Sequence, residues 1–344
     1  MTSRLVSDER GIPMKLIRKA ALPSPCPIPG RALRMACVGL VQTRWYESPE
    51  LHREQLRDGV STCAEAGANV VFLPELTLSR YPADSRPDGA ADETAEDLNT
   101  GESVKLAQAL ARDCDVFVQI SLFERSGADD QRGLNTSVIV APNGDIVGRT
   151  RKLHIPVTEG YFEDEYFAEG PADDPYPVHT LALDGQDIRV GNPTCWDEWF
   201  PEVARCYALG GADLLCYPTA IGSEPDHPEF DTAPLLRTVV SGHAIANGLF
   251  IALPNRFGAE GLITFYGGSC LIDPFGRVLV EAPRDEAAAM VADIDLGQRD
   301  DWLTLFPFFA TRRPETYREL IEARQNPRQP DGRARDGGIP GIKL

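Results

Sequence analysis

The sequence predicts an α/β fold in which a mixed β-sheet is layered with helices. Short apolar runs alternate with segments of helical spacing in the first half of the chain, and in the second half apolar runs follow one another across turn sequences. The 344 residues, 42% apolar and 25% charged, have the composition of a globular chain that buries a large core. We therefore expect an α/β sandwich, built as one large domain or as two smaller ones.

The regular pattern of the first half begins at residue 35. Residues 35–42 are an apolar run expected to form a buried strand, and residues 47–66 have helical spacing that stops at Gly67. The long polar loop at residues 79–100 is expected to be a functional lid or an insertion. The other expected elements are strands at 69–73, 115–122, 135–141 and 146–150 and a helix at 102–114.

The second half begins with a short apolar strand, Ile188 to Val190, that leads to a lone cysteine, Cys195. Pro201 and Glu202 suit the first turn of a helix that follows it. The remaining expected elements are strands at 213–217 and 249–253, a helix at 234–247, and strands within 262–294 around the turn 273–276. Hairpins in this half and strand–helix alternation in the first half predict the mixed sheet.

The two ends of the chain differ from the rest in composition. Residues 1–34 hold seven Lys and Arg against two acidic residues, and four prolines between Pro23 and Pro29 exclude a helix there. We expect a flexible basic extension at 1–34, with a transit peptide or a true start near Met35 as alternatives. The folded domain is expected at 35–322 and an extended tail at 323–344.

Composition also limits the class of function. The net charge of −18 argues against non-specific binding to nucleic acid or to an anionic membrane surface. The longest apolar run is shorter than the roughly 18 residues that a membrane span needs. The eight cysteines are scattered without CxxC pairs, which predicts a reducing compartment, the cytoplasm. The chain has no Walker loop and no dinucleotide fingerprint, so we expect no cofactor.

Three residues that could carry chemistry follow strands: Glu75, Lys152 and Cys195. Ligand sites of α/β sheets gather beyond the strand ends, so these side chains are expected to converge. A semi-buried carboxylate suits a general base, a lysine can stabilise an oxyanion, and a thiol can attack a carbonyl carbon. The alternative for each is a structural role: a strand cap, a solvated loop charge and an inert core thiol.

Cys195 is also expected to lie at a strand-to-helix turn. The N-terminus of a helix lowers the pKa of a thiol and offers backbone N–H groups to a developing oxyanion. A metal site is an alternative for the loop after residue 225, which contains Asp226, His227, Glu229 and Asp231, but most such polar runs are solvated. We expect no metal.

Three segments in this order resemble the nitrilase superfamily of carbon–nitrogen hydrolases, and the resemblance spans residues 35–320. They are Pro74-Glu75, the run Arg151-Lys152-Leu153-His154-Ile155-Pro156, and the run Cys195-Trp196-Asp197-Glu198-Trp199-Phe200-Pro201-Glu202. The resemblance implies an α-β-β-α sandwich that forms homo-oligomers. It also implies that Glu75 is the general base, Lys152 the stabiliser of the tetrahedral intermediate and Cys195 the nucleophile.

Further residues are similar to the N-carbamoylputrescine amidase and β-ureidopropionase branch of this family. The similarity rests on residues 217–225, 242–247, 255–256 and 265–269. It implies that Glu163, with Glu159 and Glu165 as near rivals, positions the substrate and the lysine. The other site residues that we expect are Trp196, Glu198 and Glu224 at the substrate and His154 in support of the lysine loop.

The expected activity is that of a thiol amidohydrolase acting on a small N-carbamoyl amine such as N-carbamoylputrescine. Alternatives are a β-ureidopropionase-like enzyme, an aliphatic amidase, a nitrilase, or a catalytically silent scaffold. The sequence departs from the branch at Asn192-Pro193-Thr194, where apolar strand residues are expected. It also departs at Glu198, where glutamine is usual, and at Leu235-Leu236, where a tryptophan-containing segment is common. Because proline donates no N–H, the strand must be interrupted before Cys195.

Overall fold

The computed structural model describes residues 14–321. The chain divides into two compact units, Met1–Phe306 and Pro307–Leu344. The described part of the first unit contains two large β-sheets, a separate β-hairpin and five α-helices. The sequence predicted a domain that ends at residue 322, whereas the first compact unit ends at Phe306.

The second unit is described as far as residue 321. It holds two short 3-10 turns, Pro314–Thr316 (η4) and Arg318–Leu320 (η5), and none of its described residues is buried. This lack of buried side chains explains why the segment does not belong to the first compact unit. The predicted tail at 323–344 lies outside the described residues.

The first sheet has seven strands in the order β1-β15-β2-β3-β4-β5-β6. Pairing is parallel between β1 and β15 and from β2 through β4, and antiparallel elsewhere, so the sheet is mixed as predicted. The bounds in this order are β1 Lys15–Lys19, β15 Ala288–Asp295, β2 Met35–Gln42, β3 Val70–Phe72, β4 Phe117–Glu124, β5 Leu134–Val140 and β6 Ile146–Arg151.

The second sheet has six strands in the order β14-β13-β10-β9-β8-β7. Its bounds are β14 Val278–Glu281, β13 Cys270–Ile272, β10 Phe250–Leu253, β9 Leu214–Cys216, β8 Gln186–Gly191 and β7 Val178–Leu183. A hairpin of two further strands, β11 (Phe257–Glu260) and β12 (Ile263–Tyr266), belongs to neither sheet. Strand β8 ends at Gly191, which confirms the predicted interruption before Cys195.

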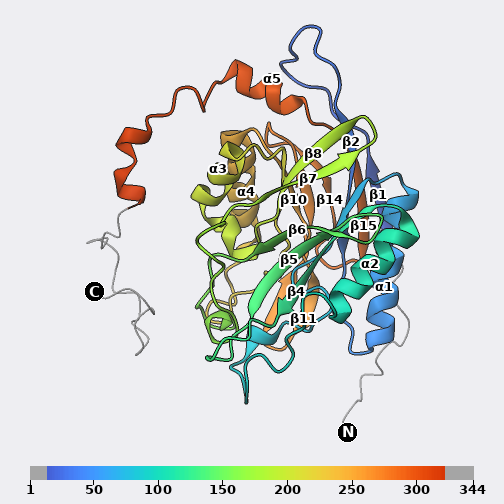
Figure 1. Ribbon diagram of the computed structural model, residues 1–344, viewed down its shortest axis with the longest axis vertical. Helices are drawn as coiled ribbons and strands as arrows, with labels where there is room; N and C mark the ends of the chain where they lie inside the picture. The colour runs from blue at the N-terminus through green and yellow to red at the C-terminus, as the bar shows by residue number, and fades with distance from the viewer. Residues whose placement is uncertain (1–13, 322–344) are drawn as a thin grey trace. The chain divides into compact units, whose positions relative to one another are not determined.

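Helices lie on both outer sides of the paired sheets. Figure 1 shows α1 and α2 on one side and α3 and α4 on the other, which confirms the α-β-β-α sandwich. Helix α1 begins where the Ser48 hydroxyl accepts the N–H of Leu51, at 3.2 Å. The bounds are α1 Pro49–Glu65, α2 Glu102–Cys114, α3 Pro201–Leu209, α4 Ala233–Asn247 and α5 Gln298–Leu305, with 3-10 turns η1 Pro82–Asp84, η2 Glu163–Glu165 and η3 Cys195–Trp199.

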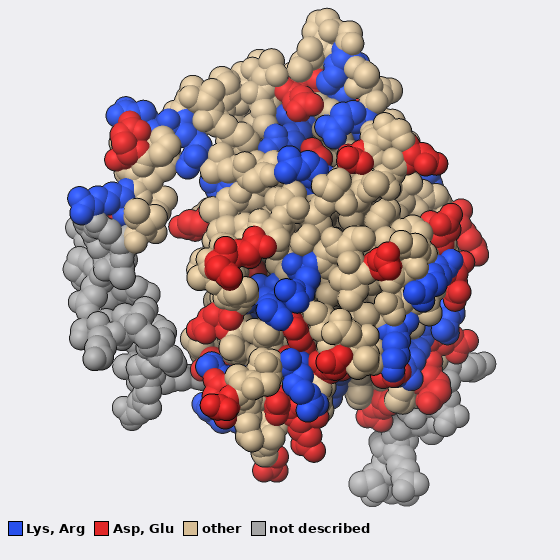
Figure 2. All heavy atoms as spheres, viewed as in Figure 1, with Lys and Arg blue, Asp and Glu red and all other residues tan. Residues whose placement is uncertain are grey.

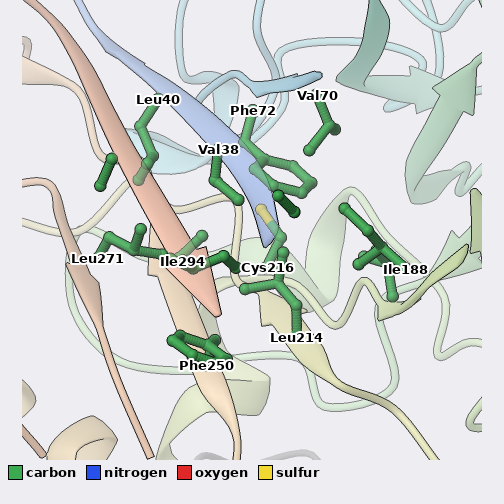
Figure 3. Close-up of a cluster of buried hydrophobic side chains, with 14 of the residues drawn as sticks. Val38, Leu40, Val70, Phe72, Ile188, Leu214, Cys216, Phe250, Leu271 and Ile294 are labelled. Atoms are coloured by element: carbon green, nitrogen blue, oxygen red, sulfur yellow. The ribbon is translucent and has the colours of Figure 1, made fainter. Parts of the chain in front are cut away.

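The main hydrophobic core fills the space between the two sheets. Val38 and Phe72 from the first sheet meet Leu214 and Phe250 from the second, and all four side chains are at most 1% exposed (Figure 3). A second cluster packs α1 and α2 against the outer face of the first sheet. Apolar burial of this extent holds the strands firmly, so the loops beyond the strand ends have a rigid base.

Residues 14–34 are ordered, contrary to the expectation of a flexible extension at 1–34. Strand β1 pairs in parallel with β15, and Arg18 forms two hydrogen bonds of 3.1 Å with Asp293. Farther along, the Arg31 guanidinium bonds to Asp295 and Asp301 at 2.7–3.1 Å. Prolines do exclude a helix here, but backbone pairing and ion pairs fix the extended chain. Residues 1–13 lie outside the described part.

Charged side chains of both signs are mixed over the face shown in Figure 2. This distribution does not offer nucleic acid a continuous basic surface on that face. None of the helices within residues 14–321 is both long and apolar enough to cross a lipid bilayer.

Candidate active site

The three side chains that the sequence singled out lie just beyond strand ends of the two sheets. Glu75 follows β3 after two residues, Lys152 follows β6 directly, and Cys195 opens η3 after β8. All three are buried, with exposed fractions of 0%, 1% and 4%. Strands β3 and β8 contribute to the core between the sheets and β6 pairs with β5, so these positions depend on the sandwich as a whole.

Lys152 lies between two buried carboxylates. Its Nζ donates to Glu75 Oε1 at 2.9 Å and to Glu163 Oε2 at 2.6 Å. Glu75 Oε1 also accepts from Asn135 Nδ2 at 2.7 Å, and Glu163 Oε1 accepts from the Tyr81 hydroxyl at 2.8 Å. Of the three glutamates considered near this position, Glu163 is therefore the one that contacts the lysine.

These contacts set the charge of the lysine and of its second carboxylate. Burial opposes the charge of Lys152, but the carboxylates of Glu163 and Glu75 outweigh it and raise the pKa of the ammonium well above 10.5. Burial raises the pKa of Glu163 to about 7, although the bond from Lys152 acts in the other direction. The lysine is thus cationic at neutral pH, and the pKa of Glu163 lies close to neutral pH.

Cys195 is held in a strained and buried turn. Its φ of 42° lies in the left-handed region, which a side chain disfavours, and its N–H donates to the Pro218 carbonyl at 3.0 Å. Burial, followed by the negative charge of Glu75, raises the pKa of the thiol well above 9.0. The predicted lowering of this pKa by a helix N-terminus is therefore wrong. Turn η3 is only five residues long, and the loss of solvent dominates.

Asp197, which the sequence did not single out, joins the lysine loop to the cysteine turn. Its carboxylate accepts from the backbone N–H of His154 at 3.0 Å and from Thr194 N–H at 3.1 Å. The ring of His154 adds a 2.7 Å contact to the same carboxylate and stacks on Phe200 at 3.8 Å between centroids. His154 is thus tied to the turn of Cys195 through Asp197; its role in support of the lysine loop stays a prediction.

A cavity of about 220 Å³ opens above Cys195. Trp196 and Glu224, both expected at the substrate, line it together with Glu163. Burial raises the pKa of Glu224, whose Oε1 lies 3.3 Å from the Thr232 hydroxyl. The complete lining is Pro156, Thr158, Tyr161, Glu163, Cys195, Trp196, Trp199, Ile221, Glu224 and Thr232.

Glu198 is not part of this lining. It is fully buried, and its Oε2 contacts the Thr219 hydroxyl at 3.1 Å while Oε1 finds no partner among the described residues. Burial raises the pKa of Glu198 well above 4.5, although the hydrogen bond from the Thr219 hydroxyl acts in the other direction. Glu198 was expected at the substrate, but its side chain is fully buried and is not among the residues that line this cavity.

The loop considered as a possible metal site is engaged in other contacts. Asp231 forms bonds of 2.8 and 3.1 Å with Arg284. Within residues 14–321, no group of three His, Cys, Asp or Glu side chains is placed to hold a metal ion. The side chains gathered at the site offer carboxylates, a lysine ammonium and a thiol.

Comparisons with known proteins identify the family to which the chain belongs. The family model for carbon-nitrogen hydrolases matches residues 34–303. The chain is 33% identical over 288 residues to a citrullinase of Francisella tularensis, covering 83% of this chain and 97% of that protein. It is 32% identical over 298 residues to an N-carbamoylputrescine amidase of Arabidopsis thaliana, covering 84% and 94%. A solved carbon-nitrogen hydrolase from Helicobacter pylori is 30% identical, with a TM-score of 0.75, and the match covers 85% of this chain and 100% of that one.

Proposed function

This chain belongs to the carbon–nitrogen hydrolase family, and we propose that it is a thiol amidohydrolase that cleaves the ureido group of a small N-carbamoyl amine. The proposal assigns the nucleophile to Cys195, the general base to Glu75 and the stabilising cation to Lys152. The observation that carries it is the Glu75–Lys152–Glu163 cluster, fully buried next to a thiol at the base of a small cavity. Burial of this kind is costly in free energy and is typical of catalytic sites.

The hydrogen bonds around Glu75 support its role as base. Oε1 is occupied by Asn135 and Lys152, whereas Oε2 is buried and has no partner among the described residues. A free oxygen on a fixed carboxylate can accept a proton from the Cys195 thiol. The raised pKa of that thiol means that it is neutral at rest, so the reaction requires such a base.

In the first half of the proposed reaction, Glu75 removes the proton of Cys195 while the sulfur attacks the ureido carbon. The oxyanion forms beside the Lys152 ammonium and the backbone N–H of Trp196. The first hydrogen bond within turn η3 is Asp197 N–H to the Thr194 carbonyl, at 3.0 Å, so the Trp196 N–H precedes it and is available. Protonated Glu75 then gives its proton to the leaving nitrogen, and ammonia departs.

In the second half, the carbamoyl group is bound to sulfur as a thiocarbamate. Glu75 takes a proton from water, and the hydroxide attacks the carbonyl carbon. Collapse of the second tetrahedral intermediate breaks the C–S bond and returns the proton to Cys195. The released carbamic acid decomposes to carbon dioxide and the free amine, so that every atom of the substrate and the water is accounted for.

The cavity favours a cationic substrate of limited size. At about 220 Å³ it is smaller than the roughly 300–1,000 Å³ of pockets for drug-sized ligands. Glu224 supplies an acidic group on the wall, and no Lys, Arg or His is among the described lining residues. Trp196 and Trp199 offer aromatic faces for an alkyl chain or an ammonium group. These features support N-carbamoylputrescine, the compound named for one relative, as the first candidate and a role in polyamine metabolism.

Citrulline is the second candidate, because a citrullinase is among the relatives at 33% identity. It has the same ureido group but carries a carboxylate beside its amine. The described lining of the cavity contains no Lys, Arg or His that could pair with this carboxylate, which is why citrulline ranks second.

Release of ammonia tests these assignments. The panel is N-carbamoylputrescine, citrulline, N-carbamoyl-β-alanine, an aliphatic amide and a nitrile, each with wild type, Cys195→Ala and Glu224→Gln. We expect turnover of N-carbamoylputrescine that vanishes in Cys195→Ala and a raised KM in Glu224→Gln. Full turnover by Cys195→Ala would refute the mechanism. Preference for citrulline would favour the second candidate, and a protein silent on all five with an unreactive thiol would favour a scaffold role.

We also propose that the protein is a cytoplasmic homo-oligomer. All eight cysteines are free thiols, which suits a reducing compartment. Leu209 at the end of α3 and Ile245 on α4 are 46% and 39% exposed, and both support a dimer face formed by these helices. Light scattering of wild type and of Ile245→Glu tests this, because a charge in the interface should shift the mass towards the monomer.

A further inference from the structure

A buried ion pair at the separate β-hairpin is connected to the backbone of Glu75 directly and to Glu163 through Tyr81. Arg256 immediately precedes β11, and Glu260 ends it. The Arg256 guanidinium donates to the two Glu260 oxygens at 2.8 and 3.0 Å, and each side chain is only 3% exposed. The guanidinium also lies 5.4 Å above the ring of Phe265 on β12. The pair is thus enclosed within the protein.

The other side of the guanidinium holds the turn that carries Glu75. Arg256 donates to the carbonyl oxygen of Glu75 at 2.7 Å, of Leu76 at 2.9 Å and of Ser79 at 3.3 Å. Leu76 has a φ of 47°, a left-handed conformation that a leucine adopts only when its surroundings impose it. Arg256 holds the carbonyl groups of this turn, while Ser121 accepts the N–H groups of Leu76 and Thr77 at 3.0 and 2.9 Å.

Glu260 extends the same pair to the second carboxylate. Its Oε2 accepts the backbone N–H of Tyr81 at 2.8 Å, and the hydroxyl of that tyrosine donates to Glu163 at 2.8 Å. The ring of Tyr81 is fully buried and packs edge-on against Phe265, 5.7 Å between centroids. Displacement of Glu260 would therefore move the Tyr81 backbone and loosen the hydrogen bond to Glu163.

The hairpin also holds the wall of the cavity. The Ser223 N–H donates to the Thr264 carbonyl on β12 at 2.9 Å, beside an isolated bridge between Gly222 and Phe265. A Cβ on Gly222 would lie 2.2 Å from the Thr264 oxygen, so only glycine permits this approach. Glu224, which lines the cavity, follows two residues later. One hairpin therefore contacts the segments of Glu75, Glu163 and Glu224.

We propose that Arg256, paired with Glu260, is a positioning residue for the general base: it fixes the Glu75 carboxylate for proton transfer from Cys195. The proposal rests on the proposed function of Glu75. A buried ion pair adds little stability compared with apolar residues of the same volume, so its presence beside Glu75 calls for another role. Three carbonyl acceptors in one turn suit the planar guanidinium, which a lysine ammonium cannot match.

The test compares Arg256→Ala and Arg256→Lys with Glu75→Gln. The first readout is the rate at which iodoacetamide alkylates Cys195 as pH varies, followed by mass spectrometry of the peptide that contains it. The second is kcat and KM on whichever ureido compound the wild type hydrolyses. We expect Arg256→Ala to lower kcat roughly 10- to 100-fold, the loss typical of a displaced catalytic group, with little change in KM. Its alkylation profile should approach that of Glu75→Gln.

Guanidinium ion at millimolar concentration separates positioning from general damage to the fold. It should restore part of the activity and alkylation rate of Arg256→Ala but not those of Glu75→Gln. The matched control is Arg31→Ala, which removes another enclosed arginine with two aspartate partners, Asp295 and Asp301, far from the site in sequence. This control should lower the melting temperature, keep the wild-type kcat and show no rescue.

The outcomes are distinct for the two proposals. A folded Arg256→Ala with wild-type kcat and wild-type alkylation would overturn the positioning role, as would equal rescue of Arg31→Ala. If Arg256→Ala does not fold, Arg256→Lys decides: an unchanged kcat overturns the proposal and a reduced kcat with wild-type KM supports it. If no panel compound is hydrolysed by wild type, the proposed function fails, whereas alkylation still tests Arg256 because it needs no substrate.

Discussion

The core between the sheets and the candidate active site are equally buried but opposite in chemistry. Phe250 and Leu214 in the core contact other apolar side chains, and burial itself stabilises them. Lys152, Glu75 and Glu163 in the site are also at most 1% exposed, yet burial of their charges costs free energy that only their mutual contacts offset. An apolar side chain in the core can therefore be replaced by another of similar volume with little loss of stability. Each charged side chain in the site, in contrast, depends on particular partners.

The largest effect is expected for Lys152→Met, which removes the shared cation of the site at nearly constant volume. Turnover should fall roughly 10²- to 10³-fold, as when one oxyanion donor is lost. The free energy of unfolding should fall by about 3–5 kcal/mol, because two carboxylates lose their buried partner. Denaturant titration and ammonia release measure the two losses.

The control for this substitution is Lys15→Met on β1. Lys15 is 53% exposed and pairs with Glu286 at 2.9 Å. Surface pairs of this kind contribute roughly 0–1 kcal/mol, so stability and turnover should both remain close to wild type. A Lys152→Met protein as stable and active as Lys15→Met would break the distinction between the two regions.

A loss of stability alone is expected for Phe250→Ala in the core. The side chain is 1% exposed, and its removal leaves a cavity between the sheets (Figure 3). We expect a loss of about 3–5 kcal/mol in the free energy of unfolding, with turnover per folded molecule close to wild type. A strong loss of turnover with unchanged stability would show that the core and the site are not separable in this way.

The smallest effect is a pH-dependent one at Glu163. Its folded pKa of about 7 lies above the ordinary 4.5, so the folded state binds this proton more tightly than the unfolded state. The stabilising contribution of the protonated form is complete below pH 4.5 and is lost as pH rises through 7. Wild type should therefore lose stability between pH 5 and pH 8, whereas Glu163→Gln, which has no such proton, should not. The melting temperature of Glu163→Gln minus that of wild type should rise by a few degrees over this range. Parallel curves for the two proteins would contradict the raised pKa.

Local patterns in the sequence predicted most elements of the sandwich. Strand β2 has the predicted bounds, Met35–Gln42, and helix α2 has the predicted bounds, Glu102–Cys114. Both have an apolar pattern that depends on neighbouring residues alone. Strand β1, in contrast, has only two apolar residues in Lys15–Lys19, and its partner β15 lies about 270 residues later, so nothing local indicates it.

The sequence predicted the main residues of the candidate site but not the contacts that hold them in place. Glu75, Lys152 and Cys195 follow strands, and the packing of the two mixed sheets brings these strand ends together; their catalytic roles stay predictions. Asp197 and Arg256 lie in segments that carry the resemblance, but their contacts were not predicted, because they are made to backbone N–H and carbonyl groups, which every residue carries. The sequence also predicted a lowered pKa for the Cys195 thiol, whereas burial raises it. Burial is a property of the tertiary structure, so local sequence does not show it.

Strand β1 has a consequence for how this protein can be handled. It covers the outer edge of the first sheet with a strand that contains Lys15, Arg18 and Lys19. Its neighbour in the sheet is β15, an eight-residue strand in which alanine, valine, methionine and isoleucine predominate. A chain shortened to begin at Met35 would expose that apolar edge to other chains, which pair with such edges and aggregate. The basic segment would then be the protein's own safeguard against precipitation.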